Sequence, residues 1–573
     1  MCGILSILRY NNITCSSVDI IKNNFMKQNM RGPEASDFIY DEENEYILGF
    51  HRLAINGCAD PASMQPLHLG NLTLICNGEI YNHKELAKIT DSNCSTGSDC
   101  EIILHLYEKY GIEYTLKVLD GVFAFTLIDN NLNKVFIARD PFGVRPLFIW
   151  YQDLNVRGPL IVASELKLAH LVSNFTPRPF PPGHYLETHL KNTTDITLSQ
   201  IRETTTLKYM CKPYYQINSS INNSIKTVED ATNCIRQSLT AAVEKRIVSE
   251  NRDRGAACLL SGGLDSSLIA ALVAKYLKEN GNEKLHTWSI GMSGSEDLKY
   301  ARIVSKHIGS IHHEIELSET DFINAIPSVI FDIESNDTTT VRASVGNWLI
   351  SKYISEQSDD KIVFNGDGSD EVAGGYLYFH CAPNPIEFDK ECRRLLKDIH
   401  LFDVLRSDRS ISNHGLEART PFLDRNFVDT YFSIPMHLRD HKYNKKCEKY
   451  LIREAFKDTG LLPNEILFRT KEAFSDGVST SKKSWFEIIQ DYASKKLEIK
   501  NKKEAEQKYY DMIFNNNYVY IHADDVDTSY IMPYKWMPNF IEATDASART
   551  LDVYKKINDK NNENYVISST SNN

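Results

Sequence analysis

The apolar positions in the first third of the chain follow a β-type pattern. Short apolar runs bounded by polar turn residues predict strands there, and residues 99–110 repeat apolar side chains at helical spacing. The strands are expected at 3–8, 72–75, 122–128 and 135–138. We therefore expect residues 2–190 to form one domain of two packed sheets flanked by helices.

From about residue 227 apolar strands alternate with amphipathic helices. Strands are expected at 256–260, 285–291, 313–317 and 361–365. Helices are expected at 227–249, 296–308 and 344–355 and directly after the first strand. This alternation predicts a parallel, doubly wound sheet, in which ligands bind at the carboxyl ends of the strands. The rest of this second domain, to residue 550, is predicted to be largely helical.

Two segments lack apolar periodicity. Residues 191–226 are rich in Thr, Asn, Ser and Lys and are expected to form a low-complexity linker between the domains. Residues 551–573 are rich in Asn, Lys and Ser and are expected to form a disordered tail.

Composition narrows the classes of function. A formal net charge of -12 argues against a nucleic-acid partner and against an anionic membrane surface. No apolar run approaches the length of a membrane span. The 12 cysteines form neither a CxxC motif nor a Cys/His metal spacing, so we expect free thiols in a reducing compartment and a cytoplasmic protein.

A glycine turn joins the first strand of the second domain to the helix that follows. Unpaired N–H groups and the helix dipole at such a junction favour a phosphate ligand, and Gly262 and Gly263 let the backbone approach it. Ser261 and Ser266 add hydroxyl donors, and Asp265 is expected to hold a cation that bridges the phosphates. The segment Ser261–Ser266 resembles the pyrophosphate-binding loop of the ATP pyrophosphatases, which cleave ATP to AMP and pyrophosphate. A generic Ser/Gly turn is the alternative.

An acidic loop with Asp367, Asp370 and Glu371 follows the strand at 361–365. It is either a solvated loop or a metal and acid–base cluster at a strand end. We assign Asp265 and Asp370 to Mg²⁺, which would neutralise a pyrophosphate leaving group.

The N-terminus, Met1-Cys2-Gly3, carries a second candidate chemistry. Methionine before a small residue is normally removed, which would leave Cys2 with a free α-amine. An amine with a pKa near ~8 beside a thiol with a pKa near ~8.5 supplies nucleophile and general base from one residue. The alternative is that Cys2 is a small buried hydrophobe, as most cysteines are.

Polar residues near the strand at 72–75 suit a substrate that carries an α-carboxylate and an α-ammonium group. The Asn77 amide and the Gly78 N–H are candidate donors of an oxyanion hole. Arg52 offers a fork for an α-carboxylate, and Glu79 and Asp99 can accept from an α-ammonium. Taken singly, each has a structural alternative, because Asn-Gly is common in turns and lone charges are common on surfaces.

Together with Cys2 these motifs resemble the class II glutamine amidotransferase domain. The resemblance extends through residues 140–147 and 163–165, whereas residues 57–63 depart from the family pattern. It implies an N-terminal-nucleophile αββα sandwich that hydrolyses glutamine, with Cys2 as nucleophile and Asn77 and Gly78 as oxyanion hole. The implied glutamine contacts are Arg52, Leu53, Ala54, Ile55, Asn56, Asn77, Gly78, Glu79 and Asp99.

The order of the two domains resembles that of the glutamine-hydrolysing asparagine synthetases, with eukaryotic-like segments at 401–406, 471–477 and 544–551. The resemblance implies that MgATP activates aspartate as β-aspartyl-AMP and that ammonia from Cys2 displaces AMP after crossing an interior passage. It implies catalytic roles for Asp367 and Lys471, although a Lys471 on the surface is the alternative. The implied ATP contacts are Leu259, Ser261, Gly262, Gly263, Asp265, Ser266, Ile290, Asn365 and Gly366.

Two positions depart from the synthetase pattern. Asp367 stands where the family has glutamate, and Asn365 stands where it has serine, so a backbone contact at 365 should survive better than a side-chain role. The motif around Arg419 suggests that this residue contacts aspartate.

Three other functions fit parts of the sequence. A β-lactam-forming relative would lack a working glutaminase, and the intact Cys2-Gly3 argues against it. A synthetase for another acceptor would not be expected to carry this N-terminal half. A retired enzyme serving as a scaffold should have lost Cys2, Asp265 or Lys471, and all three are present. The expected partners are glutamine, aspartate and ATP, with a homodimer as the candidate assembly.

Overall fold

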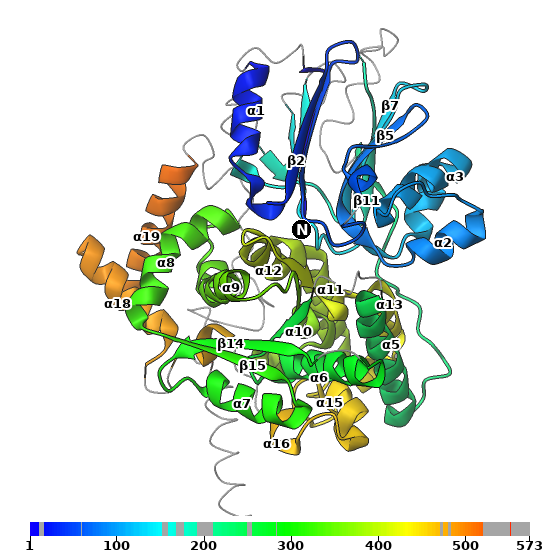
Figure 1. Ribbon diagram of the computed structural model, residues 1–573. Coiled ribbons are helices and arrows are strands. Elements are labelled where there is room, and N and C mark those ends of the chain that lie inside the picture. Colours follow the sequence, from blue (N-terminus) through cyan, green and yellow to red (C-terminus); the bar gives the residue numbers. More distant parts are fainter. Residues whose placement is uncertain are drawn as a thin grey trace, which may run out of the picture.

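The computed structural model describes residues 1–10, 17–58, 60–151, 159–167, 177–191, 210–248, 255–281, 284–469, 474–479, 483–518 and 551. The N-terminal half lies above the C-terminal half in Figure 1, and the N-terminus lies between them. Lys471, half of the predicted linker and nearly all of the predicted tail lie outside the described residues.

The N-terminal half contains two antiparallel six-stranded sheets. The first, in the order β10-β8-β9-β1-β3-β2, consists of β1 (Gly3–Leu8), β2 (Ala35–Asp41), β3 (Tyr46–Arg52), β8 (Phe148–Tyr151), β9 (Leu160–Ala163) and β10 (Pro177–Pro179). The second, in the order β12-β11-β7-β6-β5-β4, consists of β4 (Leu67–Leu69), β5 (Leu72–Ile80), β6 (Gly121–Asp129), β7 (Lys134–Arg139), β11 (His184–His189) and β12 (Lys212–Pro213). The four predicted strands correspond to β1, β5, β6 and β7.

Alternating side chains of β5 explain why a layer forms on each of its faces. Ile75 packs between the two sheets, whereas Leu74 and Cys76 pack against α3 (Ile102–Val118), beside α2 (His83–Thr90). On the outer face of the first sheet, Ile21 and Phe25 of α1 (Val18–Met26) pack against its apolar residues. The result is the αββα sandwich that the resemblance implies.

The C-terminal half is built on a five-stranded parallel sheet in the order β15-β14-β13-β16-β17. Its strands are β13 (Ala256–Leu259), β14 (His286–Met292), β15 (Ile311–Leu317), β16 (Ile362–Phe364) and β17 (Glu417–Arg419). Cys258 and Phe364 pack with α5 (Val228–Val248), α6 (Leu264–Glu279) and α7 (Glu296–Ile308). Ala257 and Val363 pack on the opposite face with α8 (Glu319–Ile333) and α9 (Thr338–Gln357), so the doubly wound prediction is confirmed.

The remaining described α-helices belong to the C-terminal half. They are α10 (Ser369–Ala373), α11 (Pro385–Asp398), α12 (Asp403–Ser412), α13 (Arg425–Ser433), α14 (Met436–Arg439), α15 (Tyr450–Phe456), α16 (Asn464–Leu467), α17 (Phe474–Gly477), α18 (Trp485–Leu497) and α19 (Lys502–Asn517). The prediction that this part of the chain is largely helical is therefore confirmed. The chain turns through a 3-10 segment at Ile399–Leu401, between α11 and α12.

Strand β17 is the strand of the described parallel sheet that the apolar pattern did not predict. Glu417 and Arg419 are buried in it and form an ion pair, with 2.6 Å between the arginine Nε and the carboxylate Oε1. Because strands are recognised by apolar or alternating positions, a strand made of a buried ion pair gives no such signal.

The two halves meet across buried charged side chains. Arg31 donates to an Asp408 oxygen at 2.8 Å, and the Lys167 backbone N–H donates to Glu334 at 2.9 Å. The α-amino group of Met1 donates to the Leu416 carbonyl at 3.3 Å. Arg31 therefore ties the N-terminal half to α12, and Met1 ties it to the residue before β17. In Figure 1, α12 lies close to the label of the N-terminus.

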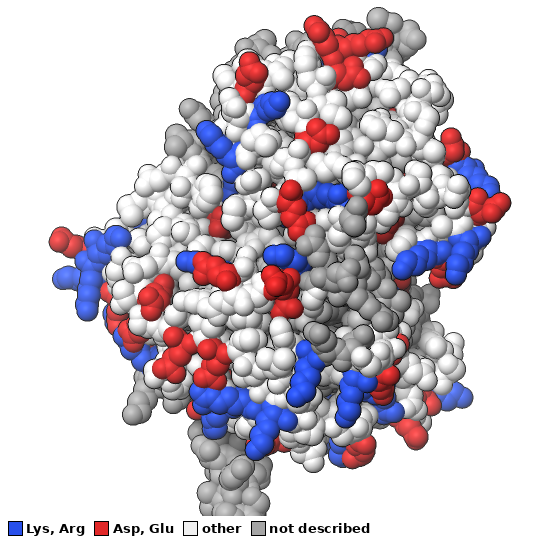
Figure 2. All heavy atoms as spheres, in the orientation of Figure 1, with Lys and Arg blue, Asp and Glu red and all other residues white. Residues whose placement is uncertain are grey.

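On the face shown in Figure 2, acidic and basic side chains are interspersed over the surface. Among the described helices, none combines the length and the apolar character that crossing a membrane requires.

Candidate active sites

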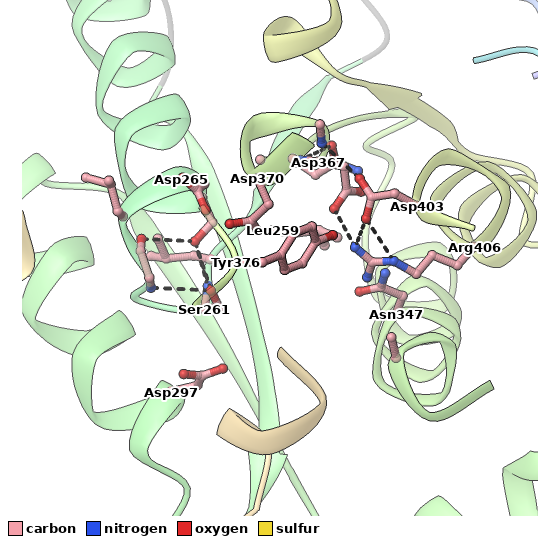
Figure 3. Close-up of a pocket in the computed structure, with 18 of the residues that line it drawn as sticks. Leu259, Ser261, Asp265, Asp297, Asn347, Asp367, Asp370, Tyr376, Asp403 and Arg406 are labelled. Atoms are coloured by element: carbon pink, nitrogen blue, oxygen red, sulfur yellow. Dashed lines mark hydrogen bonds and ion pairs between the residues drawn. The ribbon is translucent and has the colours of Figure 1, made fainter. Parts of the chain in front are cut away.

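The first candidate site is a pocket at the carboxyl ends of β13, β14 and β16. It brings together most of the residues predicted to contact ATP, although they are up to 107 positions apart in the chain (Leu259 and Gly366). The predicted residues that line it are Leu259, Ser261, Gly263, Asp265, Ser266, Ile290, Asn365, Gly366, Asp367 and Asp370. Figure 3 shows Ser261 and Asp265 on one side of this pocket and Asp367, Asp403 and Arg406 on the other.

The glycines of this site are required by close backbone packing. Gly262 has a φ of +70°, and a Cβ there would lie 2.5 Å from Tyr300 of α7, so this residue shapes the turn and does not line the pocket. A Cβ on Gly366 would lie 2.8 Å from the backbone of Asp265. The serine hydroxyls also stabilise the loop, because Ser261 Oγ lies 3.0 Å from Ser266 Oγ.

Asp265 and Asp370, the predicted metal ligands, share a lysine that the sequence did not single out. The Lys449 ammonium lies 2.7 Å from Asp265 and 2.6 Å from Asp370, and its side chain is only 1% exposed. Ser369 donates to the other Asp265 oxygen at 2.7 Å. A buried cation between two carboxylates at a phosphate loop can stabilise the pair and also contact a phosphate.

Asp367 belongs to a second ion-pair group at the pocket. Arg406 lies 3.2 Å from Asp367 and also pairs with Asp403, which accepts from the Gly368 N–H at 2.9 Å. Burial and the nearby Asp403 carboxylate raise the pKa of Asp367 to about 6, although Arg406 opposes them. The Asp367 carboxyl can therefore change its protonation state near neutral pH.

Two more residues singled out from the sequence, Asn365 in the pocket lining and Glu371 behind it, have structural roles. The Asn365 amide donates to Ser407 at 2.7 Å, so its side chain is engaged within the protein. Glu371 is fully buried and accepts from the Tyr376 hydroxyl; burial, followed by the charges of Asp403 and Asp370, raises the pKa of its carboxyl well above the ordinary value.

Lys471 lies outside the described residues, but the segment before it reaches the pocket. Arg469 lines the pocket and lies 3.0 Å from Asp297, which also lines it. The suggested aspartate contact Arg419 is not among the lining residues. It is completely buried in β17, 3.5 Å from Glu79, and that suggestion is therefore wrong.

The second candidate site surrounds Cys2 at the start of β1. The Cys2 thiol is half-buried, 3.7 Å from the Leu53 carbonyl, and packs against the apolar core between the two sheets. Burial raises the pKa of this thiol to about 11 and lowers that of the Met1 amine to about 6. With Met1 in place, the thiol is therefore protonated at neutral pH.

Asn77 and Gly78 lie inside β5, and not after its end as the sequence suggested. Both polar atoms of the Asn77 side chain are buried and have no hydrogen-bond partner among the described residues. A Cβ on Gly78 would lie 2.6 Å from the Val122 carbonyl of the neighbouring strand. A buried, unpartnered amide is energetically unfavourable unless a ligand satisfies it, and this suits an oxyanion-hole donor.

The predicted glutamine contacts frame this site from three segments. The Arg52 guanidinium donates to the Gly57 carbonyl at 2.6 Å, and Asn56 donates to Glu79 at 2.7 Å. Asp99 accepts from the Ile80 N–H at 2.6 Å. Leu53, Ala54 and Ile55 are buried along the edge that follows β3.

Glu79 and Asp99 form a buried acidic pair beside this site. Burial and the Asp99 carboxylate raise the pKa of Glu79 well above its ordinary value, and burial also raises that of Asp99. A substrate ammonium would relieve this unfavourable pairing.

One residue that sequence reasoning left without a role connects the two sites. Arg31 donates through Nε to the Cys2 carbonyl at 3.1 Å and through Nη1 to Asp408 of α12 at 2.8 Å. Helix α12 also carries Arg406, which pairs with Asp367 at the first candidate site. Arg31 stands in the sequence Arg31-Gly32-Pro33-Glu34, and nothing in this stretch indicates a partner almost 380 residues away.

Family models match both halves of the chain. The model described as asparagine synthase matches residues 234–386 and 382–519, and the model described as glutamine amidotransferase domain matches residues 1–215. The chain is 43% identical to the glutamine-hydrolyzing asparagine synthetase of Gallus gallus over 97% of this chain and 99% of that protein. The proteins of that name from Rattus norvegicus and Homo sapiens are 44% and 43% identical, with the same shares covered. The chain therefore belongs to the glutamine-hydrolysing asparagine synthetase family.

Proposed function

We propose that this protein synthesises L-asparagine from L-aspartate and ATP, with ammonia released from L-glutamine, and that AMP, pyrophosphate and L-glutamate are the other products. The observation that carries the proposal is that a thiol site and a phosphate-loop pocket lie in one chain and share buried contacts through Arg31 and α12. The family to which the chain belongs supports the pairing of these two chemistries.

At the first site, we propose that Cys2 is the nucleophile that attacks the glutamine side-chain amide. Removal of Met1 would place the α-amine on Cys2 itself, where it can take the thiol proton. The Asn77 amide and the Gly78 N–H would then donate to the oxyanion of the tetrahedral intermediate. Arg52 would hold the substrate carboxylate, and the acidic pair Glu79 and Asp99 would hold its ammonium.

At the second site, the pocket that includes Ser261, Asp265 and Gly366 would hold ATP. The N-terminus of the 16-residue helix α6 faces this loop and supplies backbone N–H groups. The buried ammonium of Lys449 would contact the phosphates and offset the charge that develops on pyrophosphate. Asp367 would accept or return a proton as ammonia attacks the activated carboxyl.

Mg²⁺ fits the same pocket. The carboxylates of Asp265 and Asp370 are the hard oxygen donors that this ion prefers, and both line the pocket. We propose that these two residues hold it, and when bound it would neutralise charge on the pyrophosphate leaving group. Lys449 already neutralises part of their charge, which fits a site that assembles around a phosphate ligand.

Product analysis with two variants tests the assignment. Purified protein is given aspartate and MgATP with either glutamine or ammonium, and asparagine, glutamate, AMP and pyrophosphate are measured. Cys2→Ala should abolish synthesis from glutamine and leave synthesis from ammonium. Asp265→Ala should abolish both, while glutamate release from glutamine reports that the N-terminal half is still folded.

Each outcome separates the two halves of the proposal. Synthesis from glutamine that survives in Cys2→Ala would refute the thiol site. Glutamate release without asparagine in the unaltered protein would refute the acceptor assignment. We also propose a cytoplasmic homodimer, which light scattering of the purified protein and fractionation of cells would test.

A further inference from the structure

Three side chains of types that bind metals converge at the start of α3. Cys94 lies in the preceding loop, Glu101 ends the 3-10 turn Asp99–Glu101, and His105 lies in the first turns of the helix. The Cys94 sulfur, a Glu101 oxygen and a His105 ring nitrogen all lie within 4.8 Å of one another, and Glu101 Oε1 is 3.4 Å from His105 Nε2. Glu101 is buried, whereas Cys94 and His105 are half-buried, so the cluster is accessible from solvent.

The chemistry of these donors matches a borderline divalent cation. Thiolate, imidazole and carboxylate are the three ligand types of Zn²⁺, and three protein ligands leave a fourth position for water. Donors around a tetrahedral Zn²⁺ lie roughly 3.3–3.8 Å apart, so the widest separation here would close by about 1 Å. Rotation of the half-buried Cys94 and His105 side chains supplies this movement.

The glutamate of the cluster is held in place by its neighbours. One Glu101 oxygen accepts from the Ser95 N–H at 2.7 Å and from its hydroxyl at 3.0 Å. The other accepts from the Thr96 N–H at 2.7 Å and from its hydroxyl at 2.6 Å. Hydrogen bonds of this kind orient a ligating carboxylate, and they keep Glu101 beside His105 before any metal arrives.

We propose that Cys94, Glu101 and His105 form a binding site for Zn²⁺ or a cation of the same class. Binding replaces the proton of the Cys94 thiol, which is released to solvent. It also displaces the weak contact between Glu101 and His105 and the 3.0 Å hydrogen bond from the Ser95 hydroxyl, which frees a lone pair of Glu101 for the metal. The linear spacing of the cysteines gave no sign of this site, because its ligands come from a loop and from successive helical turns.

The site has a consequence that rests on the proposed function. The chain between Cys94 and Glu101 contains Asp99, one of the proposed glutamine contacts, and the Gly97 N–H donates to Asp60 at 2.8 Å beside the Arg52 loop. A metal that ties Cys94 to α3 restrains this loop. It should therefore change the KM for glutamine and leave synthesis from ammonium unchanged.

Titration of the purified full chain with Co²⁺ tests the site independently of activity. A thiolate-to-cobalt charge-transfer band that saturates at one equivalent is expected. Cys94→Ser and His105→Ala should weaken binding by at least about 10–100-fold, the loss typical of removing even a residue that only hydrogen-bonds to a metal ligand. Cys234→Ser serves as the matched cysteine control, and Cys2→Ala excludes chelation by the N-terminal cysteine; both should retain the band.

The outcomes distinguish the site from other sources of binding. A band that persists in Cys94→Ser, or that disappears in Cys2→Ala, would overturn the proposal, as would the absence of a band in the unaltered protein. Circular dichroism of each variant verifies folding, and the conservative serine change keeps the test valid if His105→Ala unfolds. If the band behaves as expected but Zn²⁺ leaves the KM for glutamine unchanged, the site stands and the consequence for the loop is refuted.

Discussion

Replacing Arg31 by methionine should separate the two activities of this protein. The Arg31 side chain is 1% exposed and Asp408 is 3% exposed, and Glu165 lies 3.4 Å from the same guanidinium. Burial alone would lower the pKa of Arg31, but the two carboxylates raise it above its ordinary value, so the guanidinium is charged at all working pH values. Methionine keeps most of the stem and removes the charge.

The size of the effect follows from the contact distance. Two unit charges 2.8 Å apart attract by roughly 6 kcal/mol at an effective dielectric constant of about 20, before desolvation is subtracted. Arg31→Met leaves the buried carboxylates of Asp408 and Glu165 with less positive charge near them, although Lys167 lies 3.3 Å from Glu165. Breaking a buried pair in this way typically lowers the free energy of unfolding by about 3–5 kcal/mol.

Arg31→Met should lower the activity that depends on glutamine and leave the activity with ammonium nearly unchanged. Arg31 is the donor to the Cys2 carbonyl, so its loss lets the nucleophile move, and a displacement of about 1 Å can lower a rate by roughly 100-fold. Arg31 does not line the pocket that is proposed to hold ATP. Synthesis from ammonium should therefore stay within about twofold below the melting temperature of the variant, since distant sites usually act independently.

Urea unfolding and paired rate measurements with glutamine and ammonium are the assay. Arg31→Lys is the control, because it keeps the charge and loses the planar fork, and its losses should be smaller in both measurements. The role assigned to Arg31 would be refuted if the fully folded Arg31→Met variant lost both activities equally. An unchanged free energy of unfolding in this variant would refute it as well.

Three further predictions concern single residues of the two sites. Lys449→Met should abolish synthesis from both nitrogen donors and leave glutamate release intact. Lys352 is exposed, and Lys352→Met should change neither synthesis nor glutamate release. Product analysis measures both activities. Asn77→Ala should lower the kcat for glutamine hydrolysis by about 10²–10³-fold with little change in synthesis from ammonium, and an equal fall in both rates would contradict an oxyanion role. Because the pKa of Asp367 is raised to about 6, its carboxyl is charged above that pH and protonated below it. Synthesis of asparagine from ammonium, measured at a constant concentration of free ammonia, should therefore fall as the pH drops through 6, and Asp367→Asn should lack that step; a step that persists in the variant belongs to another group.

Local sequence patterns indicated the two candidate chemistries and predicted four of the described strands in each half of the chain. Apolar runs marked β1, β5, β6, β7 and four strands of the parallel sheet, since apolar side chains of each of these strands pack against a core. The glycine turn at Ser261–Ser266 and the N-terminal position of Cys2 carried their chemistry in short contiguous motifs. Those features depend on neighbours in the chain, which is why they were predictable.

The tertiary structure alone decided the charged pairs. Lys449 meets Asp265 across 184 positions of sequence, and Arg31 meets Asp408 across 377. A lysine or an arginine in a polar segment has the same appearance whether solvent or a carboxylate surrounds it, and burial of the pair depends on how distant elements pack. For the same reason β17 and the true environment of Arg419 were not predicted: their side chains are charged, and only the fold supplies the partners that allow them to be buried.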